Sequence, residues 1–358
     1  MNIRHTLTST VAVAALAAGI GTASAQENVK LTFLSGFPPP ATVVGAFLKG
    51  YQPAVDAQLA KTGNYKIEWN LAHSGQIVKP RGELEGLENG LGDIGIVVTA
   101  FHADKVPLYE ISYKTPFTTT NMDLITRTTK KLEGQFPQYQ ARWKEFNQTS
   151  LYPTGSVDNY LIISKSPIGG IADLKGRKVG AAGPNLPWVL AIGAAGVQTN
   201  LADAYNSLTT GIYDNMVVWA QAAGAFKLCE PAPYMLHADL GAVQSNILNI
   251  NLDVLASLPD EVRKAIVDNA ETWHVANEKI VVGAAEAMLN RCRNEFGLKE
   301  TRLPEADRQA WAKAMPPIAK EWATTLDKDG LPGSEILGIY MDAMRANNEP
   351  VLRNWDRE

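Results

Sequence analysis

The chain has 358 residues, with 46% apolar and 20% charged side chains and a formal net charge of −4 at pH 7. This composition is ordinary for a globular protein and gives no reason to expect nucleic acid or an acidic membrane surface as a partner. Roughly 330 residues remain once an N-terminal leader is set aside, which is more than one compact core usually holds, so we expect two domains.

The first 25 residues have the pattern of a secretory signal peptide. Arg4 and His5 stand in a short polar start, residues 11–20 form an apolar run, and Ala23-Ser24-Ala25 is a small-x-small cleavage pattern. A run of about ten apolar residues is too short to span a bilayer, which favours cleavage and release over a membrane anchor. We therefore expect an exported mature chain that begins at Gln26 and is not inserted in the membrane.

The chain has two cysteines, Cys229 and Cys292. In an oxidising compartment they can form a disulfide, but the sequence does not show whether their Cα atoms come within the limit of about 7 Å. Two buried thiols are the alternative. Two cysteines are too few for a metal site built from cysteine alone.

Strand and helix patterns alternate in the first part of the mature chain. Strands are predicted at 29–34, 65–71 and 93–98, where β-branched and aromatic residues or a short apolar run occur. Helices are predicted between them, at 41–60 and 79–89, from apolar residues at helical spacing. This alternation is typical of an α/β domain with a parallel sheet.

A second set of such units follows. We expect strands at 160–164, 178–181 and 247–251, and helices at 187–195, 201–209 and 220–227. The strand at 178–181 is unusual because glycine and alanine stand where a charged side chain would be expected at the mouth of a site.

One long helix is predicted over 260–294. Pro259, Asp260 and Glu261 form a helix start, and no further proline occurs before Pro304. A helix of this length would reach roughly 50 Å, enough to run along two domains. The remaining tail is predicted to be helical at 305–327 and 334–347.

Sequence signatures of common enzymes are absent: no GxSxG, HExxH, P-loop or GxGxxG segment occurs. Glu271, His274 and Glu278 share one face of the long helix and could in principle hold a metal, but a solvated helix face is the expectation. Asp203 and Asp214 could be an acid–base pair, yet both flank a helix and its following turn, where aspartate commonly caps. The sequence therefore predicts no catalytic residue, no metal site and no cofactor.

Four stretches, taken in order and spacing, carry a family resemblance: SGQIVKPRGELEGLENGLGDIGIV (74–97), IADLKGRKVG (171–180), ADAYNSLTTGIYDN (202–215) and NINLDVLASLPDEVRKAI (249–266). Together they resemble the periplasmic solute-binding proteins of TRAP (tripartite ATP-independent periplasmic) transporters, of the dicarboxylate- and sialate-binding type. The resemblance covers about 230 residues besides the export signal.

The resemblance implies a fold and a role. The fold is α/β, a two-lobe periplasmic binding protein (a Venus flytrap) with crossing strands and one long helix that spans both lobes. After the signal peptide at 1–25, lobe one would comprise 26–157 plus 246–285, and lobe two 158–245 plus 286–358, including the C-terminal helices. Such a protein would capture a small organic solute in the periplasm and deliver it to membrane permease subunits driven by an ion gradient, without catalysis.

The family's anion clamp is missing at the matched positions. By the resemblance, the strand after DLKGxK carries an arginine that holds the ligand carboxylate, and here this position is Gly180. A second arginine of sialate-type members falls at Tyr160, and an asparagine after the turn falls at Val218. Burying a carboxylate without a cation costs several kcal/mol. We therefore expect a ligand that is not a simple dicarboxylate.

Two alternatives for the ligand stay open. The first is an organic acid held by a cation from elsewhere, namely Lys79, Arg81 or Lys178; Lys178 shares a strand face with Gly180 and is expected deeper in the sheet. The second is a ligand held by aromatic rings, which would stack on a flat or sugar-like solute or form a cation–π contact with an amine. The predicted ligand-binding residues are Phe37, Gln76, Arg81, Thr99, Tyr160, Gly180, Asn185, Trp188 and Trp219.

Other classes were weighed as well. One branch of the resembling family binds 2-oxo acids through a metal beside a Glu-Trp pair, but Val217-Val218-Trp219 offers no carboxylate. An exported enzyme would use the His274 face or the Asp203 and Asp214 pair. A sensor or scaffold protein would bind the same solute but pass the signal to a partner other than a permease.

Overall fold

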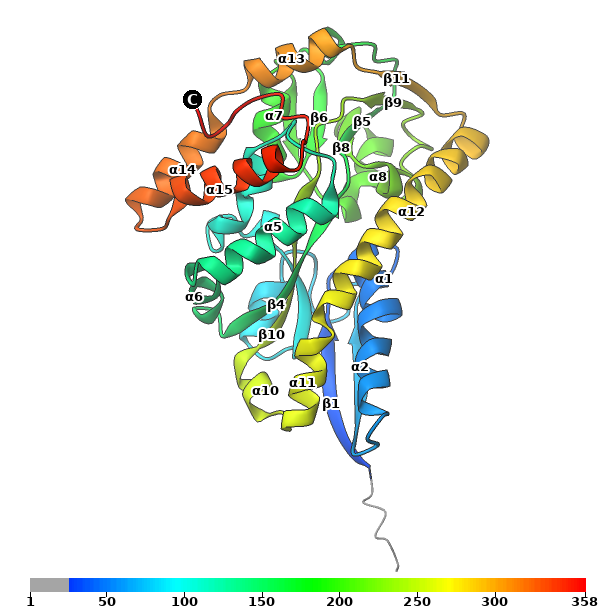
Figure 1. Ribbon diagram of the computed structural model, residues 1–358. Coiled ribbons are helices and arrows are strands. Elements are labelled where there is room, and N and C mark those ends of the chain that lie inside the picture. The colour runs from blue at the N-terminus through cyan, green and yellow to red at the C-terminus, as the bar shows by residue number, and fades with distance from the viewer. Residues whose placement is uncertain (1–25) are drawn as a thin grey trace, which may run out of the picture.

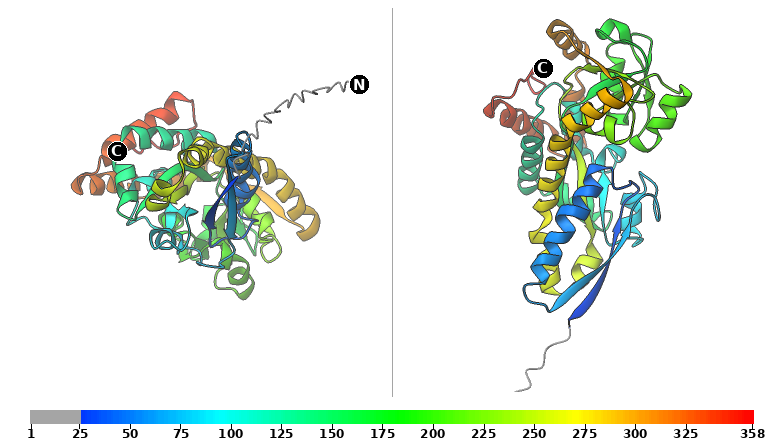
Figure 2. Two further views of the ribbon diagram at one scale, coloured as in Figure 1. Left: turned by 90° about the horizontal axis from the view of Figure 1, so that it is seen from below. Right: turned by 90° about the vertical axis from the view of Figure 1, so that its right-hand side faces the viewer.

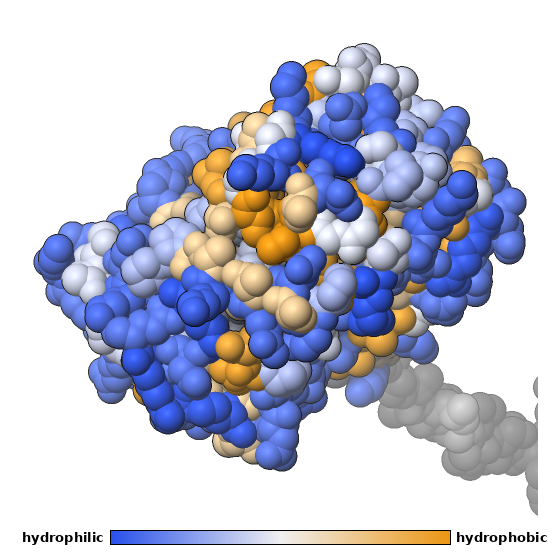
Figure 3. Space-filling view, turned by 90° about the horizontal axis from the view of Figure 1, so that it is seen from above, coloured by the Kyte–Doolittle hydropathy of each residue, from blue (hydrophilic) through white to orange (hydrophobic). Residues whose placement is uncertain are grey.

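The structure, a computed structural model, describes residues 26–358, so the predicted signal peptide lies outside the described residues. Two lobes stand one above the other, and the C-terminal helices lie beside the upper one (Figure 1). Between residues 26 and 358, no helix combines the length and apolarity needed to cross a membrane. Seen from above, the surface is mostly hydrophilic, with apolar groups gathered in a central area (Figure 3).

The lower lobe contains a five-stranded sheet in the order β2-β1-β3-β10-β4. Its strands are β1 (Glu27–Leu34), β2 (Tyr65–Ala72), β3 (Ile94–Val98), β4 (Gln148–Val157) and β10 (Val243–Asn251). The pairings of β1 with β2 and β3 are parallel, as predicted, whereas β10 runs antiparallel to both β3 and β4. The parallel pairing predicted from the first part of the mature chain is therefore found, and the sheet as a whole is mixed because β4 and β10 complete it in the antiparallel sense.

The helices of this lobe pack on the sheet through apolar faces. The predicted helix at 41–60 consists of α1 (Thr42–Ala46), a π-helical turn (Phe47–Tyr51) and α2 (Gln52–Leu59), with the Phe47 ring stacked on Phe33 of β1 at 3.8 Å. The predicted helix at 79–89 is shorter, α3 (Glu83–Glu88). Arg81 has a left-handed φ of 82° and its N–H donates to the Glu83 carboxylate, so a turn precedes the helix.

The upper lobe contains a six-stranded sheet in the order β11-β9-β5-β8-β6-β7. Its strands are β5 (Leu161–Ser164), β6 (Lys178–Ala181), β7 (Ala195–Gln198), β8 (Asn215–Val218), β9 (Tyr234–His237) and β11 (Lys299–Arg302), and its helices are α7 (Leu186–Leu190), α8 (Leu201–Thr210) and α9 (Ala220–Ala225). The predicted helix at 187–195 is thus too long, because residues 195–198 pair with β6 as strand β7.

Two crossing strands and one helix join the lobes. β4 and β10 pair along their length and rise from the lower sheet toward the upper lobe (Figure 1). Helix α12 (Ala270–Phe296) packs on α1 in one lobe and on α9 in the other, and it runs past both in the side view (Figure 2). The predicted helix at 260–294 is divided: α11 (Asp260–Asp268) ends at Asn269, whose amide donates to the Ala265 carbonyl.

The remaining helices are α4 (Ile111–Lys114), α5 (Met122–Gln135), α6 (Gln138–Lys144), α10 (Leu252–Ser257), α13 (Glu305–Ala314), α14 (Ile318–Lys328) and α15 (Gly333–Ala346). Of these, α10 lies at the lower end and α13 at the upper end of the molecule (Figure 1). The predicted helix at 305–327 is interrupted at Pro316-Pro317, because proline lacks the N–H that a helix interior needs. Trp311 and Trp355 tie this tail to the core, donating from Nε1 to the carbonyls of Trp188 and Pro116.

The two cysteines form a disulfide. Cys229 and Cys292 have Cα atoms 5.6 Å apart and link the segment after α9 to α12. This resolves the alternative that the sequence left open: in residues 26–358 no cysteine remains as a thiol. The bond fastens the upper lobe to the end of the helix that spans both lobes.

Candidate ligand-binding site

A cavity of about 110 Å³ lies between the lobes, where strand ends from both sheets face each other. From the lower lobe it receives Phe37, just after β1, and Phe101, just after β3; from the upper lobe it receives Asn185, after β6, and Trp219, after β8. Ligands of α/β proteins commonly bind at the carboxyl ends of strands.

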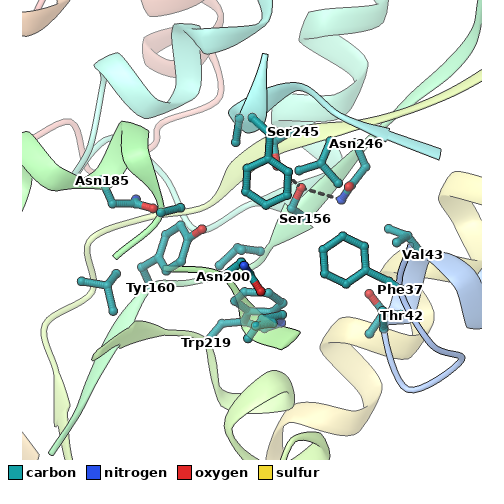
Figure 4. A pocket seen from close by; sticks show the side chains of 18 of the residues that line it. Phe37, Thr42, Val43, Ser156, Tyr160, Asn185, Asn200, Trp219, Ser245 and Asn246 are labelled. Atoms are coloured by element: carbon teal, nitrogen blue, oxygen red, sulfur yellow. Dashed lines mark hydrogen bonds between the residues drawn. The ribbon is translucent and has the colours of Figure 1, made fainter. Parts of the chain in front are cut away.

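The crossing strands form the third wall of the cavity. Asn246 of β10 donates from Nδ2 to Ser156 Oγ of β4 at 2.6 Å, and this oxygen also lies 2.6 Å from Ser245 Oγ (Figure 4). The Tyr113 hydroxyl donates to Ser245 Oγ at 3.3 Å. These polar groups are therefore held in place by one another before any solute binds.

Among residues 26–358, the side chains that line the cavity include no charged residue and no histidine. Its residues are Phe37, Ala41, Thr42, Val43, Val98, Ala100, Phe101, Tyr113, Ser156, Val157, Tyr160, Ala182, Asn185, Thr199, Asn200, Leu201, Met216, Val217, Trp219, Gln221, Phe226, Ser245 and Asn246. An ion bound against this lining would find no counter-charge. The lining instead offers aromatic faces, amides and hydroxyls.

Tyrosine rings add no charge to this wall. Burial raises the pKa of the Tyr160 hydroxyl well above its usual value, and raises the pKa of Tyr113 to about 12. Both hydroxyls therefore keep their protons at neutral pH. The Tyr160 ring meets Trp219 edge-on at 6.0 Å and Trp188 edge-on at 5.6 Å, so its orientation is set by packing.

Two lining side chains have buried polar atoms without a hydrogen-bond partner. Asn185 is 1% exposed, and neither its Oδ1 nor its Nδ2 is bonded; Nε1 of Trp219 is likewise unbonded. Leaving such a group unsatisfied costs about 1–3 kcal/mol. In native proteins such atoms are normally satisfied by water or a ligand.

Four of the nine predicted ligand-binding residues line the cavity: Phe37, Tyr160, Asn185 and Trp219. In Figure 4, Phe37 lies opposite Asn185 and Tyr160, with Trp219 below them. Gln76 is exposed outside the cavity. Thr99 is buried, and its hydroxyl donates to the Ser245 carbonyl, so it positions the crossing strand rather than facing the cavity.

Gly180 and Trp188 also lie outside the lining. A Cβ at Gly180 would meet the Tyr213 ring at 2.7–2.9 Å, so the bare strand accommodates an internal ring on that face. Trp188 is fully buried and donates from Nε1 to the Tyr113 carbonyl. Its ring contacts two cavity-lining rings, Tyr160 at 5.6 Å and Tyr113 at 6.1 Å between ring centres.

The three basic residues that were candidates for a relocated cation are not in the lining. Lys79 is exposed near the Gly75 carbonyl, and Lys178 is exposed at the start of β6, so the expectation that Lys178 lies deep in the sheet is wrong. Arg81 comes nearest: its guanidinium carbon is 4.5 Å from the centre of the Phe101 ring, which does line the cavity.

Sequence patterns missed several lining residues. Ser156, Ser245 and Asn246 belong to the crossing strands, and β4 was not predicted at all. Asn200 also lines the cavity, although its Oδ1 caps α8 by accepting from the Ala202 and Asp203 N–H groups. The position of Asn200 directly before a helix predicts a helix cap, but it does not indicate a binding site.

The carboxylates and histidine singled out in the sequence have structural partners. His274 is 1% exposed, so the expected solvated face is wrong: its Nε2 lies 3.1 Å from Asp123 Oδ1 and its Nδ1 lies 3.0 Å from Thr154 Oγ1. Burial would raise the pKa of Asp123, but hydrogen bonds from Arg127 and His274 lower it overall. Glu278 completes a group of three possible metal ligands within 4.8 Å of one another.

The acid–base pair that the sequence raised has separate partners. Asp203 accepts from the Asn200 amide, and Asp214 lies 3.6 Å from Lys165 Nζ. Neither residue lines the interlobe cavity. Both carboxylates therefore take part in local contacts at the ends of α8 and of the following turn.

A family comparison decides the class of protein. The sequence model of the bacterial extracellular solute-binding proteins, family 7 (DctP), matches residues 54–325, which is most of the chain. The chain belongs to this family. It is thus a TRAP-type extracytoplasmic solute-binding protein, and the predicted resemblance and two-lobe fold are confirmed.

Solved structures of TRAP solute-binding proteins share its fold. A protein from Rhodoferax ferrireducens T118 with copurified benzoate has a TM-score of 0.77 at 17% identity, over 89% of this chain and 98% of that chain. The ectoine-binding protein of Halomonas elongata has 0.74 at 17%, over 89% and 100%. A Bordetella pertussis receptor that binds pyroglutamic acid has 0.73 at 17%, over 88% and 99%.

Membership in family 7 relates the interlobe cavity to solute binding. TRAP solute-binding proteins bind small solutes outside the cytoplasm and work with membrane permease subunits. The cavity lies between the two sheets, at the strand ends and crossing strands.

Proposed function

We propose that this TRAP protein captures a small organic solute without a carboxylate, holding it by aromatic rings and neutral hydrogen bonds. The observation that carries the proposal is the lining of the cavity, in which every side chain is uncharged. A carboxylate brought into this cavity would lose its hydration and gain no cation. A linear dicarboxylate would suffer this penalty twice.

The aromatic side chains supply the attraction in place of charge. Phe37, Phe101, Trp219 and Phe226 present rings to the cavity, and Phe37 stacks on Phe101 at 6.5 Å. A flat or ring-shaped solute gains apolar burial and oriented ring contacts from such walls. The named relatives bind benzoate, ectoine and pyroglutamic acid; all three are small molecules with a single ring, and each also carries a carboxyl group, which this proposal does not assign to the solute of the present chain.

Capture is proposed to proceed by closure of the lobes around the crossing strands. In this proposal lobe one is 26–157 plus 246–285 and lobe two is 158–245 plus 286–358. Ser156 and Asn246 lie on β4 and β10, where the two lobes are joined, so a bound solute contacts the joint as well as both lobes. The closed form would then be delivered to permease subunits at the periplasmic face of the membrane.

The proposal is tested with three probes of one shape and different charge: benzyl alcohol, benzylamine and benzoate. We expect the neutral or positive member to raise the melting temperature of the purified mature protein, because a ligand at 100 times its Kd stabilises the fold by about 2.7 kcal/mol. Succinate and malate serve as the dicarboxylate comparison. Stabilisation by benzoate or by the dicarboxylates, without stabilisation by the uncharged or positive probe, would overturn the proposal.

A second candidate keeps the same site but accepts an organic acid with the help of Arg81. The observation that favours it is the position of the guanidinium over the Phe101 ring, one side chain away from the cavity. A long, flexible arginine at the rim can pair with a carboxylate that projects from the cavity. In that case benzoate would bind better than benzyl alcohol, and binding would depend on Arg81.

A further inference from the structure

Asn185 differs from the other buried amide side chains in the described part of the chain. It is the one amide whose nitrogen and oxygen are both buried and both without a partner. Its backbone N–H donates to the Ala182 carbonyl, so a turn after β6 fixes where the side chain begins. Figure 4 shows its amide on the side of the cavity where the Tyr160 hydroxyl lies.

The unpartnered atoms of the cavity cluster on the upper-lobe wall. Of the lining residues, Asn185 and Trp219 alone have buried polar atoms without a partner, and both follow strands of the upper sheet. The opposite polar groups, Ser156, Ser245 and Asn246, are already bonded to each other. The cavity atoms that a solute can supply with new hydrogen bonds are therefore those of Asn185 and Trp219.

The chemistry of these atoms restricts the solute further than the absence of charge does. An ammonium offers donors only and would leave Asn185 Nδ2 unsatisfied, while a carboxylate offers acceptors only and would leave Oδ1 unsatisfied. An edge with a carbonyl oxygen beside an N–H satisfies both atoms in one planar, two-bond pairing. If Oδ1 and Nδ2 of Asn185 exchange positions, the side chain still offers one donor and one acceptor, so the two-bond pairing with such an edge is still possible.

We propose that the solute is a cyclic amide, such as a lactam, a pyridone or a pyrimidinedione, whose C(=O)–NH edge pairs with Asn185. The ring lies among the aromatic side chains of the cavity, and where it carries a second carbonyl, as in a pyrimidinedione, that oxygen can accept the Nε1–H of Trp219. This inference rests on the proposed function, because it specifies which neutral solute the same cavity takes.

The test measures binding of 2-pyridone and N-methyl-2-pyridone to the mature, disulfide-bonded protein by calorimetry. The two probes share ring and carbonyl, and differ in the N–H that would donate to Asn185 Oδ1. We expect 2-pyridone to bind at least about tenfold more tightly, the effect of one lost hydrogen bond that leaves its partner buried. Equal affinity, or no binding of either probe, would overturn the amide inference.

Variants locate the contact. Asn185→Leu should weaken 2-pyridone binding at least about tenfold, since both bonds are lost. Asn206→Leu, the same change on the exposed side of α8 in the same lobe, should leave binding within about twofold. Asn185→Ala, which removes both polar atoms without adding a larger apolar side chain, should also weaken binding and covers the case in which the leucine variant does not fold. Unchanged 2-pyridone affinity in a folded Asn185 variant would overturn the inference.

The outcomes separate this inference from the proposed function. If benzyl alcohol raises the melting temperature but 2-pyridone gains nothing over its N-methyl form, the uncharged site stands and the amide edge is wrong. If benzoate or succinate is the only ligand bound, both are wrong.

Discussion

The ring of Tyr213 fills the space that a side chain at residue 180 would need. A Cβ built on Gly180 lies 2.7 Å from Cζ, 2.8 Å from Cε2 and 2.9 Å from Cε1 of that ring. The Tyr213 hydroxyl lies 3.0 Å from Thr199 Oγ1, so the ring is anchored at its far end as well. The absence of a side chain at this position is therefore part of the packing of β6 against its neighbours.

Gly180→Ala is expected to destabilise the protein by about 1–3 kcal/mol, because the anchored ring must move to admit a methyl group. The free energy of unfolding in urea measures this. Gly283→Ala is the control, since a Cβ there meets nothing within 4 Å and helix α12 gains an alanine. An unchanged stability in Gly180→Ala would show that Tyr213 is not held as described. Gly180→Arg would disturb the same ring, so loss of binding in that variant would not by itself report a ligand contact.

Glu110 makes stability depend on pH. Burial raises the pKa of this carboxyl to about 7, with a small opposing effect of Lys114, and neither of its oxygens has a hydrogen-bond partner. The unfolded chain loses this proton near pH 4.5, whereas the folded chain keeps it until about pH 7. Stability should therefore be greatest below about pH 4.5 and fall as the pH rises to about 7, by about 3 kcal/mol for this group.

Glu110→Gln should remove this dependence, because the amide carries no charge. We expect the free energy of unfolding of the variant minus that of the parent to increase by about 2–3 kcal/mol between pH 4.5 and pH 8. Urea unfolding at both pH values measures this difference. Glu83, whose pKa burial also raises to about 7, keeps its own slope in both proteins. Glu68→Gln, at an exposed position on β2, is the control and should show no such change. A difference in the free energy of unfolding between Glu110→Gln and the parent that does not change with pH would contradict the prediction.

The Cys229–Cys292 disulfide should contribute substantially to stability. It closes a loop between residues separated by 63 positions, and a cross-link of this kind is worth about 2–4 kcal/mol. The Cys229→Ala/Cys292→Ala double variant should unfold at correspondingly lower urea concentration. A reductant should destabilise the parent protein and leave the double variant unaffected; equal stability of the two proteins would contradict the expectation.

Arg81→Gln distinguishes the two candidate ligand classes. The substitution removes the charge over Phe101 and keeps a non-glycine residue at the left-handed position, so backbone strain is the same in both proteins. For an uncharged ring solute we expect affinity within about twofold of the parent, because Arg81 does not line the cavity. A loss of about tenfold or more, measured with benzoate, would favour the organic-acid candidate. Lys79→Gln, an exposed change in the preceding loop, is the control.

Much of the secondary structure followed from local patterns. β6 occupies Lys178–Ala181 as predicted, and the strands β1, β2 and β3 lie within two residues of the expected ranges. β4 was missed because Pro153, Gly155 and neighbouring polar residues obscure its period. The divided helices at Asn269 and Pro316-Pro317 show that apolar periodicity can continue across a change of direction.

For the cavity lining as well, the position of a residue in the chain predicted some of the members but not all of them. Phe37, Tyr160, Asn185 and Trp219 follow or open strands, and their place in the chain was enough to single them out. Gly180 and Trp188 also lie in or just after a strand of the upper sheet, yet neither lines the cavity. A strand's position in the chain predicts which end carries a site, but not which of its two faces is open.

The residues along the chain were sufficient to predict an export pattern and to identify the family, because these depend on residue identity and spacing alone. The folded chain was required to show that Tyr213 covers Gly180, that the cysteines meet, and that Asn185 faces an uncharged cavity with its amide unbonded. Each of these joins residues that are distant in the sequence or lie on opposite faces of a strand. Such contacts arise from packing, which local periodicity does not encode.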